Sequence, residues 1–388
     1  MTARLAAVTV TTLLPVALAG CGGTQQPVKR EPCLAAQVTA GVNTTWVLKP
    51  DNSAWYWGYG WPGQSIPSDL PAAAWPSLPP DTTELRMRSN IVCALSSNGD
   101  LRCQAGPSLG CCSYTASGQF ACSCGKPNAQ TTALAGVVRV KMGVSSNGNL
   151  NDPVAQPDVA TNFAITTDST LWEVWYTEDD PGRSTFSQVT ALGNDVLTAS
   201  AGWLQRCAVK TDGTVWCWGR GYLGDGTDAY PSTDPEQPPV SVTLPLPAVD
   251  VVAAWSATEV VLADGSVWHW GDTGFGIATT PTATGVSDVK MLVAGAFHHC
   301  ALKNDGSAWC WGRNDVGEAG VEPGGPGWQT PRQVTSLGND VTQLAAGEMH
   351  TCARKSDATI WCWGHGGWGQ LGGNKSVNPT PIQMMGCQ

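Results

Sequence analysis

The chain of 388 residues has little charge and none of the long apolar stripes that mark amphipathic helices. Only 13% of its residues are Asp, Glu, Lys or Arg. Glycine (45 residues) and proline (27 residues) are abundant instead, which is typical of many short strands joined by turns. The composition therefore predicts an all-β protein with scarce helix, and at 42% hydrophobic residues it can bury a substantial core.

Common catalytic and cofactor motifs are also missing. The sequence contains no GxSxG elbow, no HExxH and no EF-hand spacing. Glycine-rich runs that begin at Gly58, Gly219 and Gly364 spell a dinucleotide fingerprint, but none opens a helix in a βαβ unit. We expect no cofactor and no metal.

One acidic loop has the residue types of a calcium site. Its irregular spacing favours a solvated loop over a Ca²⁺ site. The residues are Asp225, Asp228, Asp234 and Glu236.

A long apolar run occurs only at the N-terminus. Arg4 precedes an apolar run from Leu5 to Leu18, which is short for a membrane span and typical of a secretory signal. Leu18-Ala19-Gly20-Cys21 resembles the lipobox of bacterial lipoproteins, where cleavage leaves a lipidated cysteine at the new N-terminus. We expect residues 1–20 to be a lipoprotein signal peptide, Cys21 to be lipidated, and residues 21–32 to form a tether to the membrane.

Cysteine usage and charge agree with export. One of the 15 cysteines is assigned to lipid, and the other 14 can form seven disulfides in an oxidising compartment. Loss of residues 1–20 leaves 20 basic and 31 acidic residues, so the net charge is about −11 and nucleic acid is excluded as a partner. We expect the protein to be located in the bacterial cell envelope. The outer membrane is favoured because Gly22 differs from the acidic residue of an inner-membrane retention signal.

A hairpin element recurs seven times along the chain. The clearest copies run from Cys207 to Gly219, from Cys300 to Gly312 and from Cys352 to Gly364, and each has a turn signal midway. The turn residues lie at positions 51, 98, 168, 212, 264, 305 and 357. Apart from one enlarged step, their spacing is the size of a four-stranded propeller blade.

The register of the hairpin explains why cysteine returns after ten residues. If Gly213 adopts the left-handed conformation in a three-residue loop, Cys207 faces Cys217 in a close, non-hydrogen-bonded pair that suits a disulfide. Other units hold a different pair at this position, such as Trp46 opposite Tyr56. A second non-cysteine pair, which could form an ion pair, is Glu259 opposite His269. The predicted hairpin disulfides are Cys93–Cys103, Cys207–Cys217, Cys300–Cys310 and Cys352–Cys362.

Tryptophan follows the same register. Ala208 faces Trp216, and a small or branched residue opposite tryptophan recurs in most other units. Large opposite small is how stacked sheets fill space, so we assign 11 of the 19 tryptophans to packing between blades rather than to sugar stacking.

Several segments resemble the repeat of the regulator of chromosome condensation family. These are Val293–Leu302 with Asp305-Gly306 and Trp311-Gly312, Trp363–Gly372, Thr330–Val334 and Thr380–Gln383. The resemblance spans nearly all of residues 33–388, is strong in the last four units and loose in the second and third, and implies a seven-bladed β-propeller with four-stranded antiparallel blades.

The resemblance implies less about function. The family's eukaryotic namesake is an exchange factor for a small nuclear GTPase and docks on chromatin, and an exported chain meets neither. A secreted bacterial relative by fold, the propeller-type β-lactamase inhibitor protein, suggests protein binding through one propeller face.

Two irregular features involve the remaining cysteines. An insertion at residues 105–136 contains four of them, and disulfides Cys112–Cys122 and Cys111–Cys124 are favoured over a zinc site because exported thiols oxidise and no histidine is near. Their connectivity stays open. Cys33 and Cys387 are expected to pair and close the propeller.

The candidate binding site lies in loops that converge on one propeller face. His298 and His350 occupy a Gly-x-x-His position, where imidazole either closes the loop by a hydrogen bond or acts in catalysis. The side chains of these loops form a predicted ring, which consists of Trp203, Trp255, Phe297, His298, Glu348, Met349 and His350. This ring either anchors a partner or fills the central channel.

These features predict a non-enzymatic, envelope-anchored, monomeric binding module for an envelope or extracellular protein or glycan. The alternatives are a secreted polysaccharide lyase or hydrolase, and an inhibitor of an envelope enzyme. A histidine that meets Asp or Glu in an axial pocket would favour an enzyme.

Overall fold

A computed structural model describes residues 31–58, 73–75, 78, 81–88, 91–105, 112–114, 120–122, 134–142, 162–177, 180–227, 237–322, 327–372, 377–385 and 387. The chain divides into the units Met1–Arg30 and Glu31–Gln388. The predicted signal peptide, Cys21 and most of the predicted tether lie outside the described residues. Within the described ranges, no helix has the length and apolarity needed to cross a membrane.

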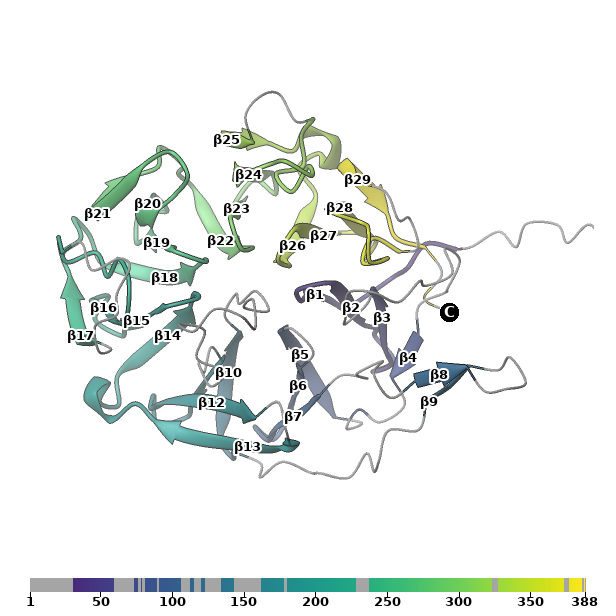
Figure 1. Ribbon diagram of the computed structural model, residues 1–388, viewed down its shortest axis with the longest axis horizontal. Coiled ribbons are helices and arrows are strands. Elements are labelled where there is room, and N and C mark those ends of the chain that lie inside the picture. The colour runs from purple at the N-terminus through teal and green to yellow at the C-terminus, as the bar shows by residue number, and fades with distance from the viewer. Residues whose placement is uncertain are drawn as a thin grey trace, which may run out of the picture. The chain divides into compact units, whose positions relative to one another are not determined.

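The unit Glu31–Gln388 is a seven-bladed propeller, as predicted (Figure 1). Blade 1 contains β1 (Gln37–Ala40), β2 (Thr44–Leu48), β3 (Ala54–Gly58) and β4 (Ala73–Trp75). Blade 2 contains β5 (Thr82–Arg88), β6 (Ile91–Ser96) and β7 (Leu101–Ala105). Blade 3 contains β10 (Val137–Met142), β11 (Asn162–Thr166), β12 (Leu171–Thr177) and β13 (Asp180–Gln188). Blade 4 contains β14 (Val196–Ala201), β15 (Gln205–Lys210), β16 (Val215–Gly219) and β17 (Gln237–Val242).

The last three blades follow the same plan. Blade 5 contains β18 (Ala248–Ala253), β19 (Ala257–Leu262), β20 (Val267–Asp272) and β21 (Ile277–Ala283). Blade 6 contains β22 (Val289–Ala294), β23 (His298–Lys303), β24 (Ala308–Arg313) and β25 (Trp328–Gln333). Blade 7 contains β26 (Val341–Ala346), β27 (His350–Lys355), β28 (Ile360–Gly364) and β29 (Asn378–Gln383). Each blade is an antiparallel meander whose first strand lies nearest the centre in Figure 1.

Blade 2 carries the insertion. Three strands of this blade are described, and Leu134 bridges Leu101 at the outer edge of β7. Within the insertion, β8 (Cys112–Tyr114) and β9 (Phe120–Cys122) pair so that the backbone of Cys112 faces that of Cys122. This confirms the ten-residue hairpin register there, while Cys111 and Cys124 lie outside the described residues.

The predicted hairpin register is confirmed. Gly213 has φ +82°, its N–H donates to the Lys210 carbonyl at 2.9 Å, and Cys207 faces Cys217 with Cα atoms 4.1 Å apart. Disulfides join Cys207–Cys217, Cys300–Cys310 and Cys352–Cys362. In blade 2, Cys93 is disulfide-bonded and its backbone faces that of Cys103.

The hairpin turns carry a repeated polar cluster. Asp212 Oδ1 accepts hydrogen bonds from the N–H and hydroxyl of Thr214, the Trp216 indole donates to that hydroxyl at 3.3 Å, and Lys210 Nζ lies 5.5 Å from the Trp216 ring. These hydrogen bonds lower the pKa of the Asp212 carboxyl. We call the end of the propeller with these turns the turn face. Similar clusters begin at Asp51, Asp305 and Asp357.

The core lies between blades rather than within one sheet. Seven apolar clusters of buried residues each join two neighbouring blades, including blades 7 and 1. The second tryptophan column packs against the preceding blade, as Trp363 does against blade 6 and Trp270 against blade 4. The tryptophans of these columns therefore pack between blades, as predicted.

The seam between blades 7 and 1 closes the ring. Cys33 and Cys387 form the predicted disulfide, and the Cys33 N–H donates to the Met384 carbonyl at 3.0 Å. The Val38 N–H donates to Gln343 Oε1 at 3.0 Å. A covalent link, backbone pairing and apolar packing therefore act at one seam.

Candidate functional site

Three aromatic side chains from consecutive blades stack at the end of the propeller opposite the turn face, which we call the loop face. Trp203 and Trp255 have ring centroids 4.6 Å apart, and Trp255 and Phe297 have centroids 5.2 Å apart. They belong to the loops between the first two strands of blades 4, 5 and 6, so Trp255 lies in the blade between those of Trp203 and Phe297. We call these three half-buried residues the aromatic ladder.

Backbone hydrogen bonds hold the ladder in place. The Trp203 N–H donates to the Trp255 carbonyl at 3.2 Å, and the Trp255 N–H donates to the Ala296 carbonyl at 3.0 Å. The Ala296 N–H continues the series to the Glu348 carbonyl in blade 7 at 3.0 Å. The loops of blades 4 to 7 are thus linked to one another, and the ladder is preorganised.

Close approach of these loops requires glycine. A Cβ atom on Gly202 would lie 2.0 Å from the Ala254 carbonyl oxygen, and one on Gly295 would lie 2.5 Å from the Gly347 carbonyl oxygen. Real Cβ atoms do not make such contacts, so these two glycines allow neighbouring loops to touch.

Arg313 closes the far end of the ladder. Its guanidinium carbon lies 5.7 Å from the Phe297 ring centroid, and its Nε donates to Asp315 Oδ2. Glu318 Oε1 lies 3.9 Å from Arg313 Nε. The guanidinium is therefore shared between an aromatic ring and two carboxyl groups.

Glu348 and Met349 lie beside this end of the ladder. Burial raises the pKa of the Glu348 carboxyl to about 7, and the positive charge of Arg313 opposes that rise. Met349 is half-buried, and its carbonyl accepts from the His365 N–H at 2.9 Å. The structure thus brings five predicted residues to one face, namely Trp203, Trp255, Phe297, Glu348 and Met349.

His298 and His350 are buried and do not contribute to the surface of this face, which corrects their place in the predicted binding ring. They are 1% and 0% exposed, and their Nε2 atoms hydrogen-bond the hydroxyls of Thr351 and Thr45 in the next blade at 2.8 and 2.9 Å. Burial lowers the pKa of both imidazoles to about 3. Both histidines therefore tie blade to blade, although the hydrogen bond goes across a seam rather than within the loop.

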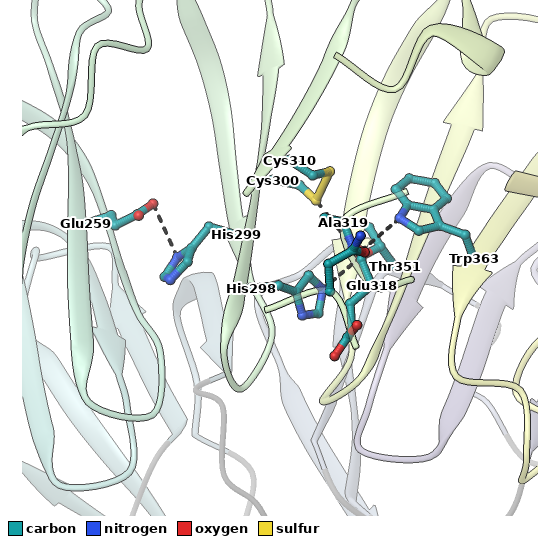
Figure 2. Close-up of a disulfide and its surroundings, with 10 residues drawn as sticks. Glu259, His298, His299, Cys300, Cys310, Glu318, Ala319, Thr351 and Trp363 are labelled. Carbon is teal, nitrogen blue, oxygen red and sulfur yellow. Dashed lines mark hydrogen bonds and ion pairs between the residues drawn. A yellow bond between two sulfur atoms is a disulfide. The ribbon is translucent and has the colours of Figure 1, made fainter. Parts of the chain in front are cut away.

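A histidine and a glutamate do meet, but inside a seam (Figure 2). His299 Nδ1 lies 3.2 Å from Glu259 Oε2 at ion-pair distance, without hydrogen-bond alignment, and the two side chains are 5% and 1% exposed. Glu259 Oε1 accepts from the Trp311 indole at 2.8 Å. Glu259 thus pairs with His299 of the next blade, although its backbone faces His269 as predicted.

Besides the ladder loops, inner-strand side chains also link blades to one another. Gln37 exchanges two hydrogen bonds with the backbone of Leu85 in blade 2, at 2.8 and 3.1 Å. Lys141 of blade 3 reaches Asp250 of blade 5 at 3.0 Å. The aromatic ladder runs around the propeller from blade 4 to blade 6 at the loop face.

No metal site is formed by the side chains that are described. Within these residues, no group of three His, Cys, Asp or Glu side chains could hold a metal ion. Asp225 accepts hydrogen bonds from the N–H and hydroxyl of Thr227, which makes a local turn. The other three acidic residues of that loop lie outside the described residues.

Sequence reasoning missed Arg313. Its signal is its position directly after a Trp-Gly pair, which also holds Arg220, Asp272 and His365 in other blades. Each of these residues donates its N–H to the loop before the second strand, as Arg313 does to Phe297 at 2.8 Å. The repeat register therefore places one such residue beside the ladder loops in each of blades 4 to 7.

Comparison with known proteins identifies the repeat. Residues 289–318, 305–354 and 341–370 match models of the regulator of chromosome condensation (RCC1) repeat. RUG3, a mitochondrial RCC1 domain-containing protein of Arabidopsis thaliana, is 29% identical over 254 residues, or 57% of this chain and 56% of RUG3. The human probable E3 ubiquitin-protein ligase HERC4 is 27% identical over 208 residues, or 49% of this chain and 19% of HERC4.

The chain thus spans about half of the first relative and a fifth of the second. Among solved structures, human WBSCR16 is 15% identical with a TM-score of 0.49, covering 92% of this chain and 83% of WBSCR16. Yeast RCC1 (Prp20), solved with Kap60, is 18% identical with a TM-score of 0.48, covering 90% of this chain and 74% of Prp20. The chain is a seven-bladed β-propeller whose residues 289–370 carry RCC1 repeats.

Proposed function

We propose that this chain is a non-enzymatic module that binds a protein through its loop face, and that lipid on Cys21 holds it in the bacterial cell envelope. The aromatic ladder is the observation that carries the binding part. Preorganised aromatic side chains amid polar groups concentrate binding energy at protein interfaces, because little side-chain entropy is lost when they are covered.

The covered ring faces favour a protein over a glycan. A sugar stacks on an open aromatic face, but the Trp255 ring contacts both Trp203 and Phe297, and Arg313 lies over Phe297. Neighbouring side chains therefore already occupy part of the surface of these rings. Such a mixed apolar and polar surface suits the flat contact of a protein partner.

Two observations support a non-enzymatic role. The His299–Glu259 pair has the spacing of a catalytic pair, but both side chains are sealed within a seam, where no substrate reaches them. His298 and His350 are equally buried and engaged with threonine hydroxyls. The loop-face residues that we assign here are aromatic, thioether and carboxyl side chains.

Capture of partners from envelope extract tests the binding face. Mature chain with Trp203→Ala and Trp255→Ala is compared with wild type and with a matched variant, Trp216→Ala and Trp309→Ala, at the turn face. We expect partner recovery to fall at least tenfold only for the loop-face variant, with thermal unfolding reporting the folded state of each. Equal recovery by both double variants defeats the assignment.

Anchoring has its own test. We expect the wild-type chain in the membrane fraction of a bacterial host and a Cys21→Ala chain in the soluble fraction, because the substitution removes the acylated thiol. Labelling with a fatty-acid analogue checks acylation directly. Membrane association of Cys21→Ala equal to wild type contradicts the anchor and leaves the binding assignment standing.

A further inference from the structure

One carboxyl group at the loop face lacks a partner. Among the described residues, the Glu348 side chain makes no hydrogen bond and no ion pair within 4 Å, although the residue is more than half buried. The positive charge of Arg313 acts on this carboxyl, but that guanidinium is occupied by Asp315, Glu318 and the Phe297 ring. His365, which is adjacent through the Met349 carbonyl, has its pKa lowered by burial and is neutral at pH 7.

The surrounding loops have excess negative charge. In the described loops of blades 4 to 7 at this face, carboxyl groups outnumber guanidinium groups six to two. The carboxyl groups belong to Asp225, Asp272, Asp315, Glu318, Glu322 and Glu348, and the guanidinium groups to Arg220 and Arg313. The whole chain has a net charge of −10. A partner with a basic surface is therefore the electrostatic complement of this face.

We propose that the loop face docks a protein with a basic surface, and that one lysine or arginine side chain of that partner binds the Glu348 carboxylate beside the aromatic ladder. This inference rests on the proposed binding function and names the chemistry of its partner. The methylene stem of the incoming side chain packs against the ring edges and the Met349 thioether, while its charged head reaches Glu348.

The geometry explains why Glu348 rather than another carboxyl forms this contact. Asp272 accepts a hydrogen bond from the Gly274 N–H, and Asp315 accepts one from Arg313, so both are satisfied locally. A cation at Glu348 stabilises a carboxylate that burial otherwise disfavours, so this pairing contributes more than one at an exposed carboxyl.

The pH dependence follows from the same contact. Lysine stays charged between pH 6 and pH 8, whereas a carboxyl with a pKa of about 7 becomes protonated as the pH falls through that range. Arg313, Asp315, Glu318 and His365 are the other titratable groups around this contact. Binding of the basic partner therefore strengthens from pH 6 to pH 8.

A lysine 20-mer serves as the probe, and a glutamate 20-mer as its opposite. Calorimetry at pH 8 on the mature chain compares wild type, Glu348→Gln and Asp272→Asn, which removes an equal charge from the same face. We expect Glu348→Gln to weaken lysine 20-mer binding about tenfold and Asp272→Asn to weaken it less than twofold. Wild type at pH 6 should resemble Glu348→Gln at pH 8.

Three outcomes overturn the inference: equal loss in the two variants, no affinity for the lysine 20-mer, or equal affinity for the glutamate 20-mer. None of these outcomes contradicts the proposed function, because that function is tested by partner capture with the ladder variants. Conversely, if the ladder variants capture partners as wild type does while Glu348→Gln loses the probe, the proposed function fails and the cation site stands.

Discussion

The turn face and the loop face are built by the same strands, yet the polar side chains at the two faces differ in where they find hydrogen-bond partners. At the turn face, an aspartate, a serine or threonine, a tryptophan and a lysine contact one another within one hairpin, as Asp212, Thr214, Trp216 and Lys210 do. At the loop face, backbone hydrogen bonds link the loops of blades 4 to 7, and the Glu348 side chain has no hydrogen-bond or ion-pair partner among the described residues. Groups satisfied within a hairpin stabilise the repeat, and the unsatisfied carboxyl and partly exposed rings are available for recognition.

The closing disulfide provides the largest expected effect on stability without a change at the loop face. Replacing Cys33 and Cys387 by serine should lower the free energy of unfolding by about 5 kcal/mol, because the bond closes a loop of 354 residues. The Cys207–Cys217 disulfide closes a loop of only ten residues, so the matched replacement of these two cysteines should cost about 3 kcal/mol. Urea unfolding measures both, and an equal cost would contradict the ring-closure argument.

His298 and His350 are buried in the seams between blades, and each forms a hydrogen bond to the next blade. Their pKa in the folded state is about 3 against 6.5 when exposed, so the unfolded chain binds protons first as the pH falls. Their contribution to stability is complete above pH 6.5 and is lost progressively towards pH 3. Between pH 7 and pH 4.5 we expect a loss of about 2 kcal/mol per histidine.

Replacing His350 by glutamine tests this loss. Glutamine occupies the equivalent position in blade 4, where Gln205 donates to the Ala254 and Ala257 carbonyls. The variant should lose about half of the acid sensitivity in unfolding experiments between pH 7 and pH 4.5. Unchanged pH dependence would show that other groups cause the acid sensitivity.

Glu348 should change stability with pH in the opposite direction to the two histidines. Its folded pKa of about 7 lies above the usual 4.5, so the folded state binds the extra proton and stability falls as the pH rises from 4.5 to 7. Glu348→Gln should therefore raise stability at pH 8 by about 2–3 kcal/mol and leave it nearly unchanged at pH 4. Thermal unfolding at the two pH values checks this, with Asp272→Asn as the control; a gain of equal size at both pH values would refute it.

The smallest effect is expected from one turn-face hydroxyl. Thr359 Oγ1 donates to Asp357 at 2.6 Å and accepts from the Trp361 indole at 3.0 Å. Thr359→Ala should cost about 1 kcal/mol of unfolding free energy, and Thr359→Ser should restore most of it. Partner binding should be unchanged in both variants, and a loss of binding on Thr359→Ala would place recognition at the turn face.

Sequence reasoning was most successful where the evidence was local. The Asp-Gly turn and the two-residue alternation of strands determine that Cys207 faces Cys217 and Ala208 faces Trp216, and both pairs are observed. The spacing of the turns predicted seven blades, and the pairing of Cys33 with Cys387 predicted the closing bond.

Contacts between blades were harder to predict. Whether His298 is exposed depends on Thr351, which lies 53 residues away in the next blade, and a repeat pattern does not report side-chain direction across a seam. The same holds for the ladder, where Phe297 occupies the second loop position yet stacks on Trp255, which occupies the first. Arg313 was missed for this reason as well.

Hydrogen–deuterium exchange of the mature chain with and without a captured partner tests the central claim most directly. Partner binding at the loop face predicts slower exchange in residues 202–204, 254–256, 295–297 and 347–349, and unchanged exchange in the hairpin turns around Asp51, Asp212 and Asp305. Protection confined to those turns, with free exchange in the ladder loops, would contradict the account.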